Sequence, residues 1–373
     1  MSVAVKLQPE ELRVEVVEGR DGFVQLEKAW NAALGAGPHD EPMLRHEWMR
    51  AYIENFAPGA TLRTFVARAG REIAAAVPLI ETGERSADTC FVPMTTWALP
   101  VNDHSQRGGL LLGRNWQAGL DLIWERLQQE AGWDRLRLRD LPDGAPDWRL
   151  RELAEKAGHP CGLWVSLRSP YLALPKKYAD VEAALEGKFR QNLRRRKRRL
   201  AELGQVKYEL TEGDEALADF FDIEASGWKG RDGTAIAQRP ELVGFYTQIA
   251  RDAAKRKALA LGILRLKDKP IAAHLSVVHA QRHYLIKIGY DESLHEHSPG
   301  QQLVSEAIRD SCERGLREFD FLGPCMDWKL DWESELRTHT WLTIFRPTQK
   351  GRLVHAARFT AWPVLRALFK KEH

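Results

Sequence analysis

The sequence has few cysteines and no long apolar segment. No C-x-x-C pair and no His/Cys cluster with zinc spacing occurs among its four cysteines, which are Cys90, Cys161, Cys312 and Cys325. We expect these thiols to be reduced, with no metal bound. No run of about 18 apolar residues is present, so the sequence predicts no membrane span. The N-terminal segment also lacks the apolar core of a signal peptide, which predicts a cytoplasmic protein.

The chain also lacks a strong overall charge. Its 373 residues include 55 Lys and Arg against 52 Asp and Glu, which gives a net charge of +3. A protein whose main partner is nucleic acid is usually more basic, so we do not expect a nucleic-acid partner. Hydrophobic residues make up 44% of the chain, which is enough for a core, and the length suits two ordinary domains.

Apolar periodicity predicts alternating strands and helices in both halves of the chain. In the first half, the expected strands are 62–69, 73–80, 134–141 and 161–174, and the expected helices are 116–130 and 147–157. In the second half, a helix is expected at 299–314, ending at Gly315, with strands at 259–266, 271–279, 283–290, 317–322 and 340–346.

The two halves also share sequence. IAAAVPL (73–79) matches IAAHLSV (271–277), and residues 122–142 resemble 303–324 in the order helix, glycine turn, strand. A period of about 190 residues is too long for a solenoid, so we interpret it as a duplicated α/β domain. No linker rich in Pro, Gly or Ser separates the halves.

The segment before the helix at 299–314 has the features of an anion site. Ser298 is a good N-cap, Pro299 suits the first helical position, and Gln301 completes a capping box. Gly300 lets a ligand approach the backbone closely. Free amides at a helix start suit a pyrophosphate; the alternative is a plain capped helix.

A basic helix is predicted near the middle of the chain. Eight of the twelve residues of KFRQNLRRRKRR (188–199) are Lys or Arg. Phe189, Leu193, Leu200 and Leu203 fall on one side, which predicts a half-buried helix with a cationic face. Like charges four residues apart weaken a helix, so we expect an anionic partner: CoA phosphates, lipid head groups or RNA. A merely solvated face is the alternative.

Four segments, taken together and in order, resemble the GNAT superfamily of acyltransferases. They are FRQNLRRRKRRL (189–200), GWKGRDGTAI (227–236), GYDESLHEHSPGQQL (289–303) and EFDFLGPCMDWKLDW (318–332). The order is similar to that of the double-domain branch, which includes cellulose-biosynthesis-type acyltransferases and Fem-type peptidyltransferases. The motif-bearing region spans 180–346.

The resemblance implies a mixed α/β fold of two tandem GNAT-like domains, each a mixed central sheet flanked by helices. It implies a degenerate domain at 1–165, an acyl-CoA-binding catalytic domain at 166–350 and an amphipathic helix at 351–373. Acyl-CoA would be the donor, without a metal. Its pyrophosphate would lie on Ser298, Pro299, Gly300, Gln301, Gln302 and Leu303. The usual loop of the superfamily is Q/R-x-x-G-x-G/A, and this chain has HSPGQQ there.

Amide formation from a thioester needs a base for the amine, a donor for the oxyanion and an acid for the thiolate. His274 is the candidate base, because its counterpart in the first half is Ala76 and packing alone does not require a histidine. A core histidine is the alternative. Asp320 could orient the amine or act as a base, or pair with Lys329 or an arginine. Tyr290, at a strand end, is the candidate acid.

Seven further residues are predicted to contact substrate: Glu224, Trp228, Lys229, Asp291, Lys329, Arg190 and Arg194. The first three lie in IEASGWKG, where the glycines favour a loop that covers the acceptor; a solvated loop is the alternative. Lys329 would bind a phosphate or a carboxylate, or else carry surface charge.

The tail 353–373 combines an apolar stripe with flanking Arg and Lys, which suits an interfacial helix on an anionic membrane; a helix docked on the second domain is the alternative. We expect an acyl-CoA-dependent N-acyltransferase without a covalent enzyme intermediate, in the cytoplasm or at the inner face of the membrane. The favoured acceptor is a lipid-like amine, such as a sphingoid base in bacterial ceramide synthesis. Three alternatives stay open: an amino sugar acceptor, a Fem-type transferase using aminoacyl-tRNA, and a non-catalytic scaffold.

Overall fold

The computed structural model describes residues 11–84, 89–227 and 233–361, which divide into two units. Unit 1 takes its residues from 1–53, 57–166 and 339–373, and unit 2 from 54–56 and 167–338. Unit 1 gives way to unit 2 after residue 166, and the boundary expected from the sequence was after residue 165. Residues 339–350, which the sequence analysis placed in the second domain, belong to unit 1 because strand β13 (Glu335–Phe345) pairs with β6 (Arg135–Pro142) there.

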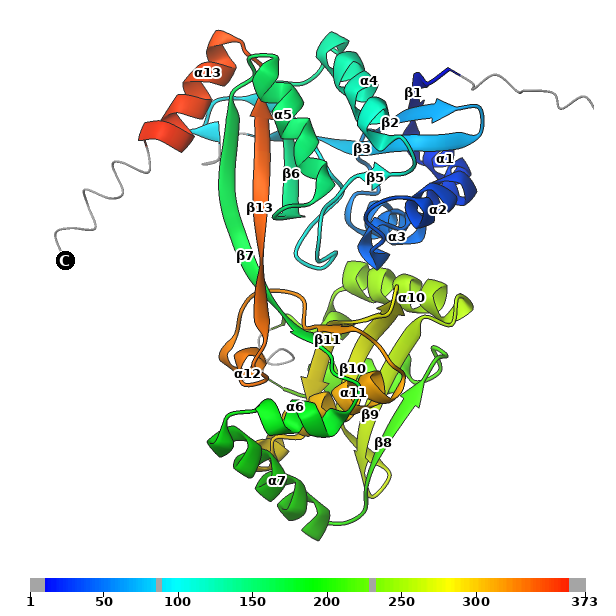
Figure 1. The fold of residues 1–373 in the computed structure, drawn as a ribbon, viewed down its shortest axis with the longest axis vertical. Coiled ribbons are helices and arrows are strands. Elements are labelled where there is room, and N and C mark those ends of the chain that lie inside the picture. The colour runs from blue at the N-terminus through cyan, green and yellow to red at the C-terminus, as the bar shows by residue number, and fades with distance from the viewer. Residues whose placement is uncertain (1–10, 85–88, 228–232, 362–373) are drawn as a thin grey trace, which may run out of the picture. The chain divides into compact units, whose positions relative to one another are not determined.

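Unit 1 is built on a mixed sheet with the strand order β1-β2-β3-β4-β6-β13 (Figure 1). Beyond β6 and β13, its strands are β1 (Arg13–Glu18), β2 (Leu62–Ala69), β3 (Glu72–Glu84), β4 (Met94–Ala98) and β5 (Leu111–Leu112), which pairs with β3. Its helices are α1 (Gly19–Gln25), α2 (Glu27–Ala36), α3 (His46–Phe56, whose last residues belong to unit 2), α4 (Trp116–Gln129), α5 (Arg149–Lys156) and α13 (Gln349–His355). Only β4 and β6 run parallel, and α4 connects them.

The core of unit 1 forms where α4 lies on β2 and β3. Leu120, Ile123 and Leu127 recur at helical spacing and are all fully buried. Gly119 allows the close approach, because a Cβ there would lie 3.1 Å from the Cβ atoms of Ala74 and Ala75. The periodicity of 116–130 therefore predicted both the helix and its buried side.

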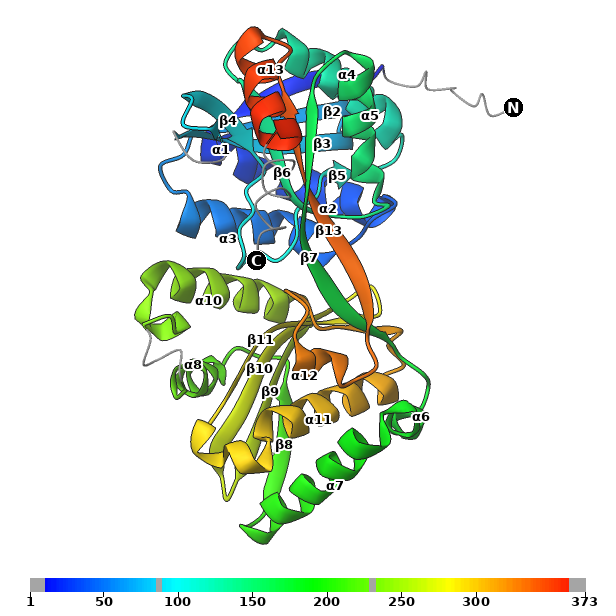
Figure 2. The same ribbon diagram turned by 90° about the vertical axis from the view of Figure 1, so that its left-hand side faces the viewer.

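Unit 2 repeats this plan with the strand order β7-β12-β11-β10-β9-β8. The strands are β7 (Cys161–Ala173, shared with unit 1), β8 (Val206–Thr211), β9 (Leu259–Leu266), β10 (Lys269–His279), β11 (Arg282–Tyr290) and β12 (Glu318–Asp320). The helices are α6 (Tyr178–Ala184), α7 (Gly187–Glu202), α8 (Leu217–Ala225), α10 (Pro240–Lys255), α11 (Pro299–Glu313) and α12 (Asp327–Leu330). Figure 2 shows α6, α7 and α11 on one face of this sheet and α8 and α10 on the other.

The duplication predicted from the sequence is confirmed in the pairing of the strands. In unit 1, β3 pairs antiparallel with β4, which pairs parallel with β6 across α4. In unit 2, β10 pairs antiparallel with β11, which pairs parallel with β12 across α11. The mixed α/β fold class is therefore confirmed. The sequence analysis did not predict the strands β1, β4, β5 and β8, or the helices α1 to α3, α6, α8, α10 and α12.

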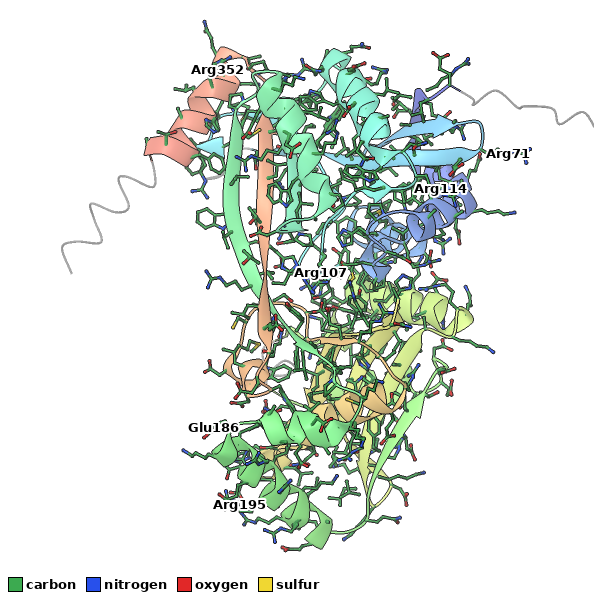
Figure 3. The ribbon with its side chains drawn as sticks, viewed as in Figure 1. Arg71, Arg107, Arg114, Glu186, Arg195 and Arg352 are labelled. Atoms are coloured by element: carbon green, nitrogen blue, oxygen red, sulfur yellow. The ribbon has the colours of Figure 1, made fainter. Side chains whose placement is uncertain are left out.

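Charged side chains cover the outside of both units. Arg71, Arg114 and Arg352 of unit 1 and Arg195 of α7 in unit 2 are exposed and labelled in Figure 3. The tail expected to be one amphipathic helix is α13 followed by a π-helix (Ala356–Ala361). The remainder, 362–373, lies outside the described residues.

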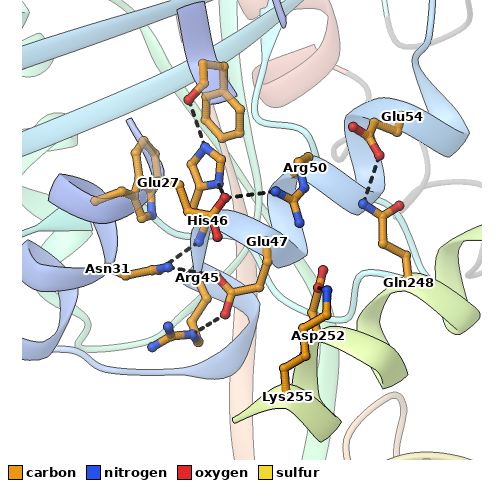
Figure 4. Close-up of polar contacts among 12 residues, drawn as sticks. Glu27, Asn31, Arg45, His46, Glu47, Arg50, Glu54, Gln248, Asp252 and Lys255 are labelled. Atoms are coloured by element: carbon orange, nitrogen blue, oxygen red, sulfur yellow. Dashed lines mark hydrogen bonds and ion pairs between the residues drawn. The ribbon is translucent and has the colours of Figure 1, made fainter. Parts of the chain in front are cut away.

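A polar network ties α1, α2 and α3 together at the start of unit 1 (Figure 4). The buried ring of His46 contacts the carbonyl of Phe23 through Nε2 at 2.8 Å, and burial lowers its pKa. The His46 amide donates to Asn31 Oδ1 at 3.1 Å, and Asn31 donates to Glu47 at 2.8 Å. These bonds link segments 15 or more residues apart, which explains why local periodicity did not predict these helices.

Candidate functional site

The parallel strands β11 and β12 stay paired over only three positions. These are Arg282 with Glu318, His283 with Phe319, and Tyr284 with Asp320, after which β11 continues to Tyr290. Since β12 ends at Asp320, the carboxyl end of β11 runs on without it. Ligands of open α/β sheets bind at such carboxyl ends.

A β-bulge lies on β11 just beyond this point. Leu275 pairs with Lys287 and Ser276 with Leu285, so Ile286 is an extra residue with no partner on β10. Bulges are frequent next to active sites because they redirect the backbone. The sequence analysis missed this feature, since only the register with β10 reveals it.

Helix α11 begins after a short 3₁₀ segment (Glu292–His297) that follows β11. Ser298 adopts a left-handed conformation (φ 48°, ψ 56°), and its side chain does not cap the helix. The predicted capping box is therefore wrong. The Gln301 amide group instead donates to the Trp328 carbonyl at 3.1 Å and accepts from the Trp332 indole at 2.8 Å.

The first amides of α11 remain available for an anion. Pro299 has no N–H, and within the described part of the chain nothing accepts a hydrogen bond from the amides of Gly300 and Gln301. A Cβ on Gly300 would lie 3.2 Å from the Tyr290 ring, so this turn packs against the end of β11. Unbonded amides and the helix dipole together favour a phosphate-type ligand.

The side chains of Gln302 and Leu303 hold α11 in place. Gln302 is buried and donates to the carbonyl of Leu193 in α7 at 3.0 Å. Leu303 is fully buried and packs in one cluster with Leu200 and Ala272. Both side chains are therefore buried in contacts within unit 2, whereas the sequence analysis expected them to contact a cofactor.

The basic helix α7 lies against α11 and brings one arginine to its start. The Arg196 guanidinium donates to Ser298 Oγ, and Lys197 forms an ion pair with Glu306 of α11 at 2.6 Å. The sequence analysis selected Arg190 and Arg194 and missed Arg196. The arginine run has no internal signal that singles out the residue facing α11.

The two arginines that were selected have partners within unit 2. Arg190 donates to the carbonyl of Ala183 at 2.8 Å, at the end of α6, and Arg194 pairs with Glu182 at 2.9 Å. The Arg194 ion pair lowers the pKa of Glu182. Both arginines thus stabilise the α6–α7 connection, which is a structural role that the prediction of substrate contacts did not include.

His274 lies on β10 in the core, where its ring is next to Tyr208 of β8 and Gly262 of β9. It is fully buried, its Nε2 contacts the Tyr208 hydroxyl at 2.9 Å, and its Nδ1 contacts Ser276 Oγ at 2.8 Å. Burial lowers its pKa to about 3. A base must reach the proton that it takes, and both ring nitrogens here already have core partners. The geometry therefore favours the alternative, a core histidine.

His274 makes stability depend on pH. Its folded pKa lies below the ordinary value of 6.5, so the unfolded chain binds the extra proton as the pH falls below about 6.5. Because of this group, we expect the free energy of unfolding of the wild type to fall by up to about 1.4 kcal/mol per pH unit between pH 6.5 and 4. In urea unfolding, His274→Gln should flatten this slope, whereas the exposed-site control His295→Gln should keep it. Equal slopes in wild type and His274→Gln would refute the assignment.

Asp320 and Lys329 are both buried beside the end of β12. Asp320 accepts from the Leu322 amide at 2.9 Å and from Arg337 at 2.8 Å. Lys329 donates to the carbonyls of Leu322 and Pro324 at 2.5 and 3.0 Å, and burial lowers its pKa to about 8. The contacts support the structural alternative for Asp320, with Arg337 as its ion-pair partner. Lys329 is buried and holds the turn after β12, whereas the sequence analysis expected it to bind a phosphate or a carboxylate, or to carry surface charge.

Tyr290 and Asp291 end β11 in different surroundings. Tyr290 is 40% exposed and lies next to Gly300 at the start of α11. Asp291 accepts from the amide and hydroxyl of Ser293 at 3.0 and 2.6 Å, and the Ser293 bonds lower the pKa of its carboxyl group. Asp291 therefore caps a turn, and Tyr290 is the predicted catalytic residue that remains accessible.

Glu224 is buried on the face of the sheet opposite α11. Its carboxylate accepts from the Ile236 amide at 2.9 Å, and its backbone lies against Gly289 of β11, where a Cβ would come within 2.6 Å of Glu224 Cα. Glu224 thus fixes the end of α8 on β11. Trp228 and Lys229, predicted beside it, lie outside the described residues.

No group of three or more His, Cys, Asp or Glu side chains suited to a metal occurs in residues 11–84, 89–227 and 233–361. Over the same ranges, no helix is both long and apolar enough to cross a membrane. The structure brings together the start of α11, Arg196 and Tyr290, and the bulge at Ile286 lies four residues before Tyr290 on β11.

Comparisons with known proteins agree with this architecture. Residues 187–330 match the family model described as an acetyltransferase (GNAT) domain. No curated protein sequence matches the chain. The structure of FemX is similar, with a TM-score of 0.60 and 12% identity over 91% of this chain and 100% of that one.

Two other solved structures share the fold. One is the C-terminal domain of a putative lysylphosphatidylglycerol synthetase from Agrobacterium fabrum, with a TM-score of 0.54 and 12% identity over 90% of this chain and 95% of that one. The other is L-PGS from Bacillus licheniformis, with a TM-score of 0.52 and 10% identity over 89% and 95%. Residues 187–330 thus match the GNAT acetyltransferase domain model, within a mixed α/β fold similar to that of FemX.

Proposed function

We propose that the protein is an acyl-CoA-dependent N-acyltransferase whose donor diphosphate lies at the start of α11. The observation that carries this proposal is the pair of unbonded amides at Gly300 and Gln301, in a domain that matches the GNAT family. The Arg196 guanidinium at Ser298 adds a positive charge at the same place. Cationic and backbone donors together suit a diphosphate.

The reaction we propose forms a C–N bond and breaks the C–S bond of the thioester. The donor supplies an activated acyl carbon, and the amine attacks it directly, losing one proton while the departing thiolate gains one. The backbone at the Ile286 bulge would stabilise negative charge on the carbonyl oxygen, because its amide lies outside the regular pairing with β10. Tyr290, accessible at the end of β11, would protonate the thiolate.

The acceptor we favour is a lipid-like primary amine such as a sphingoid base, with an amino sugar as the second choice. The direct test incubates the purified protein with acyl-CoAs from acetyl to palmitoyl and with sphinganine or glucosamine. We expect release of free CoA thiol that depends on the amine. Absence of release with every donor and both acceptors would overturn the proposed function.

Arg196→Ala is expected to raise KM for a soluble acyl-CoA about 10- to 100-fold with little change in kcat. A hydrogen bond to a charged group is worth about 1.5–3 kcal/mol, and a diphosphate contact acts equally in ground and transition states. The matched control is Arg195→Ala, since Arg195 is exposed on the same helix. Steady-state kinetics of thiol release measures both. The same KM in Arg196→Ala and wild type, or the same increase in both variants, would contradict this role.

A further inference from the structure

Helix α7 separates its cations into two sets. Its cap is Glu186, which accepts from the Phe189 amide at 3.1 Å, and it is fixed to unit 2 by the buried Leu193 and Leu200. The first set, Arg190, Arg194, Arg196 and Lys197, makes the contacts with α6 and α11 described above. Because those contacts position the helix, the first set explains only half of its basic residues.

The second set points outward and consists of Lys188, Arg195, Arg198 and Arg199. All four are exposed, and residues 11–84, 89–227 and 233–361 supply neither a hydrogen bond nor an ion pair to any of their side chains. At 100° per residue, they lie on the side opposite Leu193 and Leu200 and extend over about 16 Å. Arg195 is labelled on this helix in Figure 3. We call these four residues the outer stripe.

A shallow hollow of about 750 Å³ runs along the same helix. Its seven lining residues all belong to α7, and four of them are the cations Arg190, Arg194, Lys197 and Arg198. The hollow has a single wall in the described part of the chain, so it cannot enclose a strand or a peptide from two sides.

We propose that the outer stripe docks the protein on an anionic lipid surface. A straight row of cations on one convex helix matches a flat layer of negative charge, where all four act together. Single-stranded nucleic acid is bound by grooves with aromatic side chains for base stacking. The only aromatic residue of α7 is Phe189. It packs inward against Trp332, with 5.4 Å between the two ring centroids. The shape and composition of this face therefore favour head groups over single-stranded RNA.

Docking through the outer stripe would hold the candidate donor site near the membrane surface. Arg196 joins α7 to the start of α11, so the candidate donor site lies about one helix diameter from the outer stripe. An amine carried in the membrane would then reach the site without leaving its leaflet. The choice of acceptor rests on the proposed function, whereas the docking itself does not and is measured separately.

The test uses vesicles of phosphatidylcholine alone or mixed in equal parts with phosphatidylglycerol, and flotation of the full chain at physiological ionic strength. We expect binding only to the mixed vesicles. Each cation near an anionic surface contributes about five-fold, so changing Lys188, Arg195, Arg198 and Arg199 to Gln should weaken binding several hundred-fold. Replacing the three stripe arginines by Lys keeps the charge and should keep the binding.

The matched control changes four exposed cations of unit 1, Arg13, Lys28, Arg71 and Arg114, to Gln. It lowers the net charge equally and should bind like the wild type. The stripe variant should stay folded, because removing like charges relieves repulsion along α7. Its thermal unfolding and its thiol release with a soluble amine should be unchanged, which separates failure of docking from failure of the proposed function.

Three results would overturn the docking proposal. The first is equal binding of wild type and stripe variant to the mixed vesicles. The second is equal binding of the wild type to both kinds of vesicle, which would show that apolar contacts drive attachment. The third is binding to a transfer RNA probe that the stripe variant loses while vesicle binding is absent, which would assign this surface to RNA.

Discussion

Replacing Tyr290 by Phe is expected to lower kcat for acyl transfer by about 10²-fold or more while leaving the melting temperature unchanged. The substitution removes only the hydroxyl group, and the ring that packs on Gly300 stays in place. Since the side chain is 40% exposed, its loss leaves no buried group unpaired. A general acid acts only in the transition state, so kcat and kcat/KM should fall together.

The matched control for this variant is Tyr171→Phe. Tyr171 also carries a polar hydroxyl, which donates to Glu335 at 2.7 Å, and it lies on β7 in the same unit. Removal of the Tyr171 hydroxyl group should leave kcat unchanged within a factor of about two. Thiol release followed with a short-chain acyl-CoA measures both variants. Full activity in Tyr290→Phe would remove Tyr290 from the mechanism, and an equal loss in both variants would indicate a general effect on folding.

Asp320→Ala is expected to lower the free energy of unfolding by about 3–5 kcal/mol. The carboxylate is fully buried and accepts from the Leu322 amide and from Arg337. Its removal leaves a buried amide without this acceptor and takes one partner from Arg337, which keeps Glu318 at 3.1 Å and the Tyr171 ring below its guanidinium. Urea unfolding at neutral pH measures the loss.

The conservative variant Asp320→Asn separates structure from catalysis. Asn keeps an oxygen that can accept from the Leu322 amide and loses only the charge. The free energy of unfolding should therefore fall about half as much in Asp320→Asn as in Asp320→Ala. If Asp320 acted as a base, both variants would abolish turnover while unfolding like the wild type. That result would restore the role suggested by the sequence and refute the structural one.

The sequence predicted most of the regular elements because their signals are local. Helical spacing of Leu120, Ile123 and Leu127 identified α4, and Gly315, which adopts a positive φ of 70°, marked the end of α11. The basic helix and its buried Leu193 and Leu200 were also predicted correctly. Leu203 was expected on the same buried side, but it lies at the helix end and is 40% exposed.

For the candidate site, residue type alone does not reveal which partners a side chain has. Asp320, His274 and Lys329 have chemically useful groups, yet each is buried and bonded to the core or to a turn. Arg196 was overlooked among eight basic residues, although it alone was found donating to Ser298. The bulge at Ile286 exists only in the register between two strands.

The sequence by itself determined the alternation of strands and helices, the duplication, and the half-buried basic helix, since each depends on spacing within a few turns or strands. The tertiary structure decided which charged side chains pair with other residues of the protein and which face outward. That choice depends on residues from distant segments, such as Glu182 and Glu306 beside α7. For the same reason, only the fold could show that Arg196 meets α11 while the outer stripe stays exposed.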